Sequence, residues 1–227
     1  MKFLVIVESP AKKNKIESFL NTIKEHKFIV DASYGHICEF SNGLKSIDIN
    51  DNFKASYKIS DSKKQVVSNL LSLTKSVDEI IIATDLDREG EAIGYHLIKT
   101  LKQNINSTKR IVFNEITKSA IIKSFNNPST LNMNMFYSQQ ARSILDLLIG
   151  YNVSPLLWTK VREKLSAGRC QSPALRLVYE REMDITKFKP ENSYHLTSIF
   201  DIKIDNNIEN INTKYYKTLD TKDDIES

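Results

Sequence analysis

Four carboxylates stand within seven positions of the stretch ATDLDREGEAIG, residues 83–94. They are Asp85, Asp87, Glu89 and Glu91, and they follow the run VDEIII, which is typical of a buried strand. Like charges at this spacing repel and raise each other's pKa unless a cation lies among them. The carboxyl end of a parallel strand is where ligands bind in open α/β sheets. The first three acids are therefore predicted to converge on a hard cation, for which magnesium is well suited.

A further carboxylate follows the first predicted strand. The sequence VESPAKKNK places Glu8 at the end of that strand and Lys12 in the next turn. Because neighbouring parallel strands end at one edge of a sheet, Glu8 is predicted to lie beside the turn that carries Asp85, Asp87 and Glu89, here called the acidic turn. Glu8 would act there as an extra ligand or a proton donor. A lysine there balances charge and holds a phosphate. The simpler interpretations are a solvated lysine and acids that enrich a first helical turn, which explains the last two acids better than the first two.

These residues predict a magnesium-dependent site that handles phosphate, and two reaction classes fit them. One is phosphodiester transfer on nucleic acid, in which a metal stabilises the attacking or leaving oxygen. The other is a small-molecule phosphotransfer in which the first aspartate, Asp85, is a nucleophile.

Composition limits the class of protein. The 227 residues are 41% apolar and 26% charged, as in soluble globular proteins, and the formal net charge of +4 permits a nucleic-acid partner without requiring one. Two distant cysteines, Cys38 and Cys170, predict neither a zinc module nor a disulfide framework. The short apolar start is too brief for a signal sequence, and no stretch approaches the roughly 20 apolar residues of a membrane span. A soluble, cytoplasmic protein without a membrane partner is expected.

Strand and helix patterns alternate in the first part of the chain. Strands are predicted at 3–7, 27–33, 77–84 and 109–113, with another near 53–59. Helices are predicted from Ser9-Pro10 and over 61–75, 89–102 and 117–126. This alternation predicts an α/β fold with a largely parallel sheet.

The pattern changes after about residue 130. Residues 135–161 have a helical pattern that is predicted to break at Gly150 and Pro155. Residues 171–188 are predicted to form another helix. Residues 194–204 alternate as in a strand, and a polar tail follows. We expect three regions, at 1–130, 131–192 and 193–227.

Several segments together resemble the N-terminal part of a bacterial type IA DNA topoisomerase. They are LVIVESPAKKNKIESFL, ASYGHICEF, ATDLDREGEAIGYHL, RIVFNEITKSAI, SQQARSILDLLIGYNVSPLLWTKV and LSAGRCQSPALRLVYEREMDI. The resemblance runs from residue 3 to about residue 194. It implies a Toprim domain, then a helical segment that lines a DNA groove, then the incomplete start of an arch domain that contains β-structure.

The resemblance also implies roles for the residues at the acidic turn. Glu8, Asp85, Asp87 and Glu89 correspond to the family's magnesium site, and Glu8 also protonates a leaving oxygen. Lys12 and Arg88 correspond to contacts with the scissile phosphate.

Another set of residues corresponds to the family's contacts with DNA. They are His36, Arg142, Ser143, Asp146, Tyr151, Trp158, Ser166, Ala167, Gly168, Arg169, Cys170 and Gln171. Aromatic faces stack bases for about 1–3 kcal/mol each, although Trp158 and Tyr151 also suit a core. Ser143 replaces an arginine of many relatives, while Cys38 and Phe40 replace the usual residues of the Gly-His-Ile loop.

The family relaxes negatively supercoiled DNA by cutting one strand with a tyrosine in a motif resembling TYPRTDS, which this sequence lacks. Tyr215 and Tyr216 have no such surroundings. The chain is therefore expected to bind single-stranded DNA weakly and to depend on a missing C-terminal part of the same enzyme. A stand-alone Toprim nuclease, a primase-like protein and a non-catalytic single-stranded DNA-binding module are the alternatives. The helices beyond residue 130 make a small-molecule phosphatase the least favoured.

Overall fold

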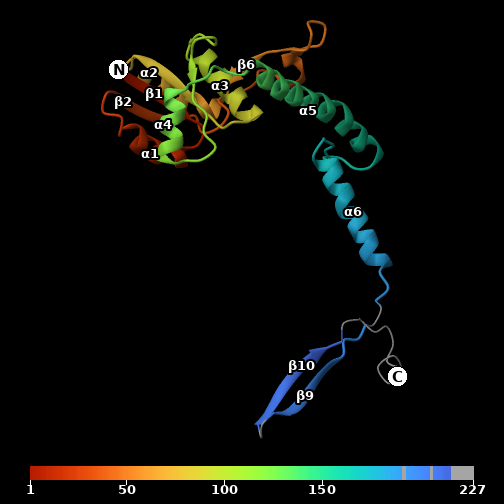
Figure 1. Cartoon of the computed structure of the whole chain (residues 1–227). Coiled ribbons are helices and arrows are strands. Elements are labelled where there is room, and N and C mark those ends of the chain that lie inside the picture. Colours follow the sequence, from red (N-terminus) through yellow and green to blue (C-terminus); the bar gives the residue numbers. More distant parts are fainter. Residues whose placement is uncertain (191–192, 205–206, 216–227) are drawn as a thin grey trace. The chain divides into compact units, whose positions relative to one another are not determined.

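A four-stranded parallel sheet forms the centre of the first part of the chain (Figure 1). The structure is a computed structural model that describes residues 1–190, 193–204 and 207–215. The strands lie in the order β2-β1-β7-β8, and all three pairings are parallel, which confirms the predicted α/β class. Their bounds are β1 Lys2–Val7, β2 Lys27–Ala32, β7 Glu79–Ala83 and β8 Lys109–Arg110.

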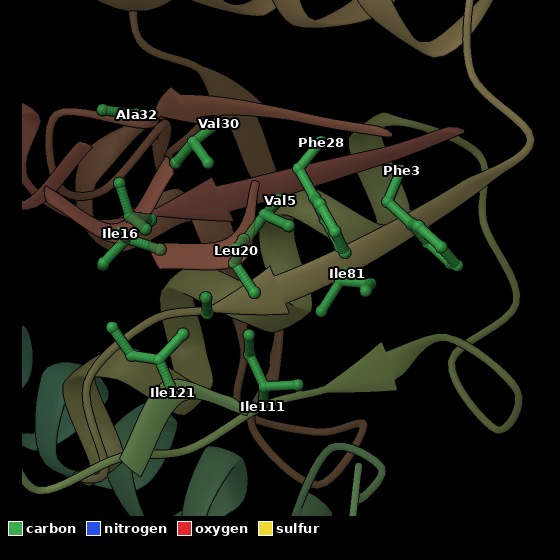
Figure 2. Close-up of a cluster of buried hydrophobic side chains, with 12 residues drawn as sticks. Phe3, Val5, Ile16, Leu20, Phe28, Val30, Ala32, Ile81, Ile111 and Ile121 are labelled. Carbon is green, nitrogen blue, oxygen red and sulfur yellow. The ribbon is translucent and has the colours of Figure 1, made fainter. Parts of the chain in front are cut away.

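Helices cover both faces of this sheet because the side chains of β1 alternate between two cores. Phe3, Val5 and Val7 pack with side chains of α1 and α4. Figure 2 labels Phe3 and Val5 in this core. Leu4 and Ile6 pack with side chains of α2 and α3 on the other face. All five side chains are buried, which explains the continuously apolar run. The helices are α1 Pro10–Leu20, α2 Lys64–Thr74, α3 Arg88–Thr100 and α4 Lys118–Asn126.

Local capping explains where the helices begin. The Ser9 side chain accepts a hydrogen bond from the Ala11 N–H at 3.3 Å, and Pro10 occupies the first turn of α1, as predicted. Thr117 caps α4 in the same way, through the Ala120 N–H. A short 3₁₀ turn, Asp61–Lys63, leads into α2.

Two small antiparallel pairs lie between β2 and α2 in the sequence. β3 Cys38–Phe40 pairs with β6 Tyr57–Ile59, and β4 Ile47–Asp48 pairs with β5 Lys54–Ala55. The strand predicted near 53–59 is therefore two shorter strands, because the chain changes partner between them. β8 is also shorter than predicted, although the Ile111 N–H still donates to the Ile82 carbonyl at 2.9 Å.

The helix α5 runs without a break over Met133–Lys160. The predicted breaks at Gly150 and Pro155 were wrong. A proline removes one N–H donor but holds a helical φ, and an interior glycine costs only about 1 kcal/mol. In a 28-residue helix that packs against α3, these local losses do not end the element.

The chain divides into two compact units, Met1–Gln171 and Ser172–Ser227. The helix α6 Gln171–Lys187 begins at the boundary. In the second unit, β9 Thr197–Ile204 and β10 Asn207–Lys214 form an antiparallel hairpin. The polar composition of β10 gave no strand signal, and its ladder partner supplies the pairing. No helix in the described part of the chain is long and apolar enough to cross a membrane.

His96 is buried on α3, with its ring centroid 4.5 Å from that of Tyr57. Burial lowers the pKa of His96 from 6.5 to about 4, and the charge of His36 adds to this effect. His96 therefore takes up a proton near pH 6.5 in the unfolded chain and only near pH 4 in the folded chain. The stability that neutral His96 contributes is fully present above the unfolded pKa and is lost as the pH falls from 6.5 to about 4. We expect the free energy of unfolding to fall by about 3 kcal/mol over this interval, measured by urea denaturation.

Two variants isolate the contribution of this histidine. His96→Phe keeps an aromatic ring in the same place without a titrating group, so its unfolding free energy should depend less on pH. His195→Gln, at an exposed histidine, should leave the pH dependence unchanged. An unchanged pH dependence in His96→Phe would contradict the prediction.

Candidate metal centre and nucleic-acid groove

Glu8 and the acidic turn lie at the same edge of the sheet because β1 and β7 are neighbours. Val7, the last residue of β1, pairs with Ala83, the last residue of β7. Burial raises the pKa of the Glu8 carboxyl, and the charges of Asp85 and Asp87 raise it further, against the lowering effects of Lys12 and His36. Asp85 and Asp87 are therefore close enough for their charges to act on the Glu8 carboxyl.

The acidic turn is held by the start of α3. Asp87 is the N-cap of that helix, and its Oδ1 accepts a hydrogen bond from the Gly90 N–H at 2.7 Å. A Cβ added at Gly90 would lie 2.1 Å from the Asp85 carbonyl oxygen, so this position requires glycine. Asp87 thus caps the helix, whereas the sequence associated the first helical turn with Glu89 and Glu91 rather than with Asp87.

Basic and amide side chains contact the two other acids of the turn. The Lys12 Nζ donates to both carboxylate oxygens of Asp85, at 2.5 and 2.7 Å. Glu89 Oε2 is 3.1 Å from His36 Nε2 and accepts from Gln139 Nε2 at 3.0 Å. Arg142 lies 3.9 Å from the other oxygen of Glu89. Glu89 therefore connects the acidic turn to α5.

A pocket of about 380 Å³ continues along α5 from this contact. It is lined by His36, Glu89, Arg142, Ser143 and Asp146, among others. The Ser143 hydroxyl accepts from the Gln139 side chain at 3.0 Å. Asp146, also in its lining, pairs with the Arg169 guanidinium at 2.8 and 3.1 Å. This pairing holds the pKa of the Asp146 carboxyl below its usual range.

Asp146 also lines a larger groove of about 1000 Å³. The groove brings together most of the residues that sequence analysis placed at DNA. They are Asp146, Tyr151, Trp158, Ser166, Ala167, Gly168, Arg169, Cys170 and Gln171. Trp158 is 48% exposed, with its indole N–H donating to the Leu165 carbonyl at 2.5 Å. Tyr151 is 55% exposed, so neither aromatic ring is core. Both are available to stack on a ligand.

Comparisons with known proteins decide the family. The Toprim domain family matches residues 3–116, and the DNA topoisomerase family matches residues 130–227. The chain belongs to the bacterial type IA topoisomerases. Full-length topoisomerase I from Thermotoga maritima has a similar structure, with a TM-score of 0.72 and 34% sequence identity. The match covers 98% of this chain and 36% of that enzyme, so the chain spans about a third of its length.

The acidic residues of this topoisomerase chain suit magnesium in their chemistry. The charges of Asp85 and Asp87 act on the Glu8 carboxyl, and carboxylate oxygens are the ligands that the ion prefers. Among the residues that the structure describes, no three His, Cys, Asp or Glu side chains already form a metal cluster. The Lys12 ammonium pairs with the Asp85 carboxylate, and the Asp87 carboxylate caps α3. Magnesium would thus take the place of Lys12 at Asp85.

Arg88 falls outside these contacts, as do the two tyrosines of the topoisomerase chain that sequence analysis had no reason to regard as nucleophiles. Arg88 is exposed at the first position of α3. Tyr215 donates its backbone N–H to the Leu196 carbonyl in the second unit. Tyr216 lies outside the described residues.

Sequence reasoning missed three residues that join parts of this site. Gln139 contacts Glu89, as described above, and its place at the start of the QQAR sequence, residues 139–142, was its only signal. Glu91 and Arg110 form a buried ion pair with a distance of 2.6 Å. Glu91 stands in the acidic cluster, where it suggested an exposed first-turn acid, but only 2% of it is exposed. The physical reason is that Arg110, on β8, neutralises it inside the fold.

Proposed function

We propose that this chain supplies the Toprim domain and part of the single-strand groove of a type IA topoisomerase. The complete enzyme cuts one DNA strand, passes the other through the gap and rejoins the cut, which relaxes negative supercoils. The tyrosine that attacks the DNA comes from the part of the enzyme that this chain does not contain. DNA in single-stranded or negatively supercoiled form is the substrate.

Each residue at the edge of the sheet has a role in this proposal. Glu8, Asp85, Asp87 and Glu89 hold magnesium, which when bound neutralises negative charge on the scissile phosphate. Glu8 gives its proton to the leaving 3′ oxygen, which suits a carboxyl whose pKa is raised. Lys12 leaves Asp85 to contact the phosphate, and Arg88 binds beside it.

The residues of α5 and of the following loop hold the strand that is cut. Arg142 binds a phosphate of this strand. Asp146, together with Arg169, orients the nucleotides that follow that phosphate. Tyr151 and Trp158 stack bases along the groove. The three regions at 1–130, 131–192 and 193–227 then correspond to the Toprim domain, the groove segment and the beginning of the arch domain.

One observation carries the proposal most strongly. Glu89 contacts His36 on one side and the α5 side chains Gln139 and Arg142 on the other. Asp146 lines both the adjoining pocket and the larger groove. A nucleic-acid strand that follows the groove along α5 therefore leads to the acidic turn.

A hybrid enzyme tests this function. The chain replaces the matching part of Thermotoga maritima topoisomerase I, and relaxation of negatively supercoiled plasmid is followed on an agarose gel. We expect magnesium-dependent relaxation by the hybrid. The 227-residue chain alone, mixed with end-labelled single-stranded DNA and magnesium, should leave neither cut DNA nor a detergent-stable adduct on a denaturing gel.

The two parts of this experiment separate the alternatives. A folded hybrid without activity would contradict the proposal. Cut DNA without an adduct, from the chain alone, would identify a Toprim nuclease. An adduct would show that a tyrosine of this chain is the nucleophile, and Tyr215 and Tyr216 would be the first to replace.

A further inference from the structure

A buried ion pair lies directly beneath the acidic turn. Arg110 Nε donates to Glu91 Oε1 at 2.6 Å, and the two side chains are only 1% and 3% exposed. Arg110 lies on β8 at the edge of the sheet, and Glu91 lies in the first turn of α3. Neither residue lines the pockets of the proposed metal and DNA site.

The rest of the Arg110 guanidinium binds the backbone from which the acidic turn begins. One terminal nitrogen donates to the Thr84 carbonyl and to the Thr84 hydroxyl, both at 3.0 Å. The other donates to the Asp85 carbonyl at 2.8 Å. The Thr84 hydroxyl in turn donates to the Gly90 carbonyl at 2.7 Å, so the turn is held at both ends. The two terminal nitrogens of one planar group thereby fix the backbone of Thr84 and of Asp85, a proposed metal ligand, while Nε binds Glu91.

Glu91 makes a matching contact with the start of α5. Its second oxygen, Oε2, accepts from the Asn132 N–H at 3.1 Å. Asn132 is the N-cap of α5, where its side chain accepts from the N–H groups of Asn134 and Met135. The ion pair therefore contacts both the acidic turn and the N-cap residue of the helix that carries Gln139 and Arg142.

Stability alone is a poor reason for such a pair. Replacing a buried ion pair with apolar side chains of similar volume is often neutral or stabilising, because the charges no longer need to leave water. What apolar side chains lack is directed hydrogen bonding to two carbonyl oxygens and one N–H. We propose that Arg110 and Glu91 are positioning residues, which set the Asp85 backbone and the start of α5 so that the acidic turn can bind its cation. This inference rests on the proposed magnesium site.

Two variants of the full chain test this role with magnesium alone, titrated by isothermal calorimetry. Arg110→Met/Glu91→Leu replaces the pair with apolar side chains. Arg110→Lys keeps a cation beside Glu91 but loses the fork to Thr84 and Asp85. Circular dichroism and thermal unfolding show which variants fold. We expect magnesium binding about 10- to 100-fold weaker in each folded variant, as for other losses of groups that orient metal ligands.

A neighbouring ion pair, which also has its cation on β8, is the matched control. Lys109 and Glu79 lie 2.9 Å apart between β8 and β7 and touch none of the acidic residues. Lys109→Met/Glu79→Leu should bind magnesium as the wild type does. A folded Arg110 variant with wild-type magnesium affinity would overturn the inference.

Failure of the metal site itself gives a different result. If the wild-type chain binds no magnesium, that part of the proposed function is wrong, and amide hydrogen exchange over residues 84–90 decides the positioning role. Faster exchange in the Arg110 variants than in the Lys109 control would support it, and equal exchange would overturn it.

Discussion

Replacing Glu8 with glutamine is expected to slow DNA cleavage by the hybrid enzyme about 100- to 10,000-fold, the usual contribution of a general acid. Glutamine keeps the size of the side chain but has no proton to give to the leaving 3′ oxygen. Affinity for a single-stranded oligonucleotide should change little, because the groove along α5 remains intact. Single-turnover cleavage of an end-labelled strand measures the rate, and fluorescence anisotropy measures the affinity.

A modified substrate separates proton donation from metal binding. With sulfur in place of the bridging 3′ oxygen, the leaving group is a thiolate, which departs without a proton because thiols are far more acidic than alcohols. The Glu8→Gln enzyme should then recover most of its rate. An equal loss on both substrates would show that Glu8 acts only through the metal. Glu25→Gln, at an exposed carboxylate in the turn before β2, is the control and should behave as the wild type does.

The second large effect concerns the contact between α3 and α5. Phe136 is 2% exposed, and its ring stacks on that of Tyr95 with the centroids 3.8 Å apart. Phe136→Ala removes this contact and leaves a cavity, so we expect the free energy of unfolding to fall by about 3–5 kcal/mol. Urea denaturation followed by circular dichroism measures the change. Binding of single-stranded DNA should also weaken, since Gln139 and Arg142 stand one turn or two further along the same helix.

The adjacent residue provides a matched control for this prediction. Tyr137 is 55% exposed, and Tyr137→Ala should change the stability by no more than about 0.5 kcal/mol. Phe136→Leu keeps much of the volume and should cost less than the alanine variant. A loss below about 1 kcal/mol in Phe136→Ala would mean that the helices do not depend on this contact.

Local patterns were sufficient for the elements around the acidic turn. The apolar run of β1 and the Ser9-Pro10 start of α1 depend on side chains within a few residues, so their sequence signals are direct. The proximity of Glu8 to the acidic turn followed from the alternation of strands and helices, which predicts parallel strands that end together. The six resembling segments then identified the family, because their order along the chain is specific.

Local patterns misled where distant residues supply the partner. Gly150 and Pro155 read as breaks, yet α5 continues through both as part of a long helix anchored on α3. The polar residues of β10 form a strand only because β9 pairs with them.

The sheet, the capped helices, the cluster of acids and the family all follow from the amino-acid sequence. Tertiary structure decided how the acids are paired: Lys12 and Asp85 are 73 residues apart in sequence, and Glu91 and Arg110 are 19 apart. No local pattern shows whether an acid will face solvent or an arginine from another strand. Burial decides it, because a charge inside a protein persists only when a partner from elsewhere in the chain compensates the loss of water.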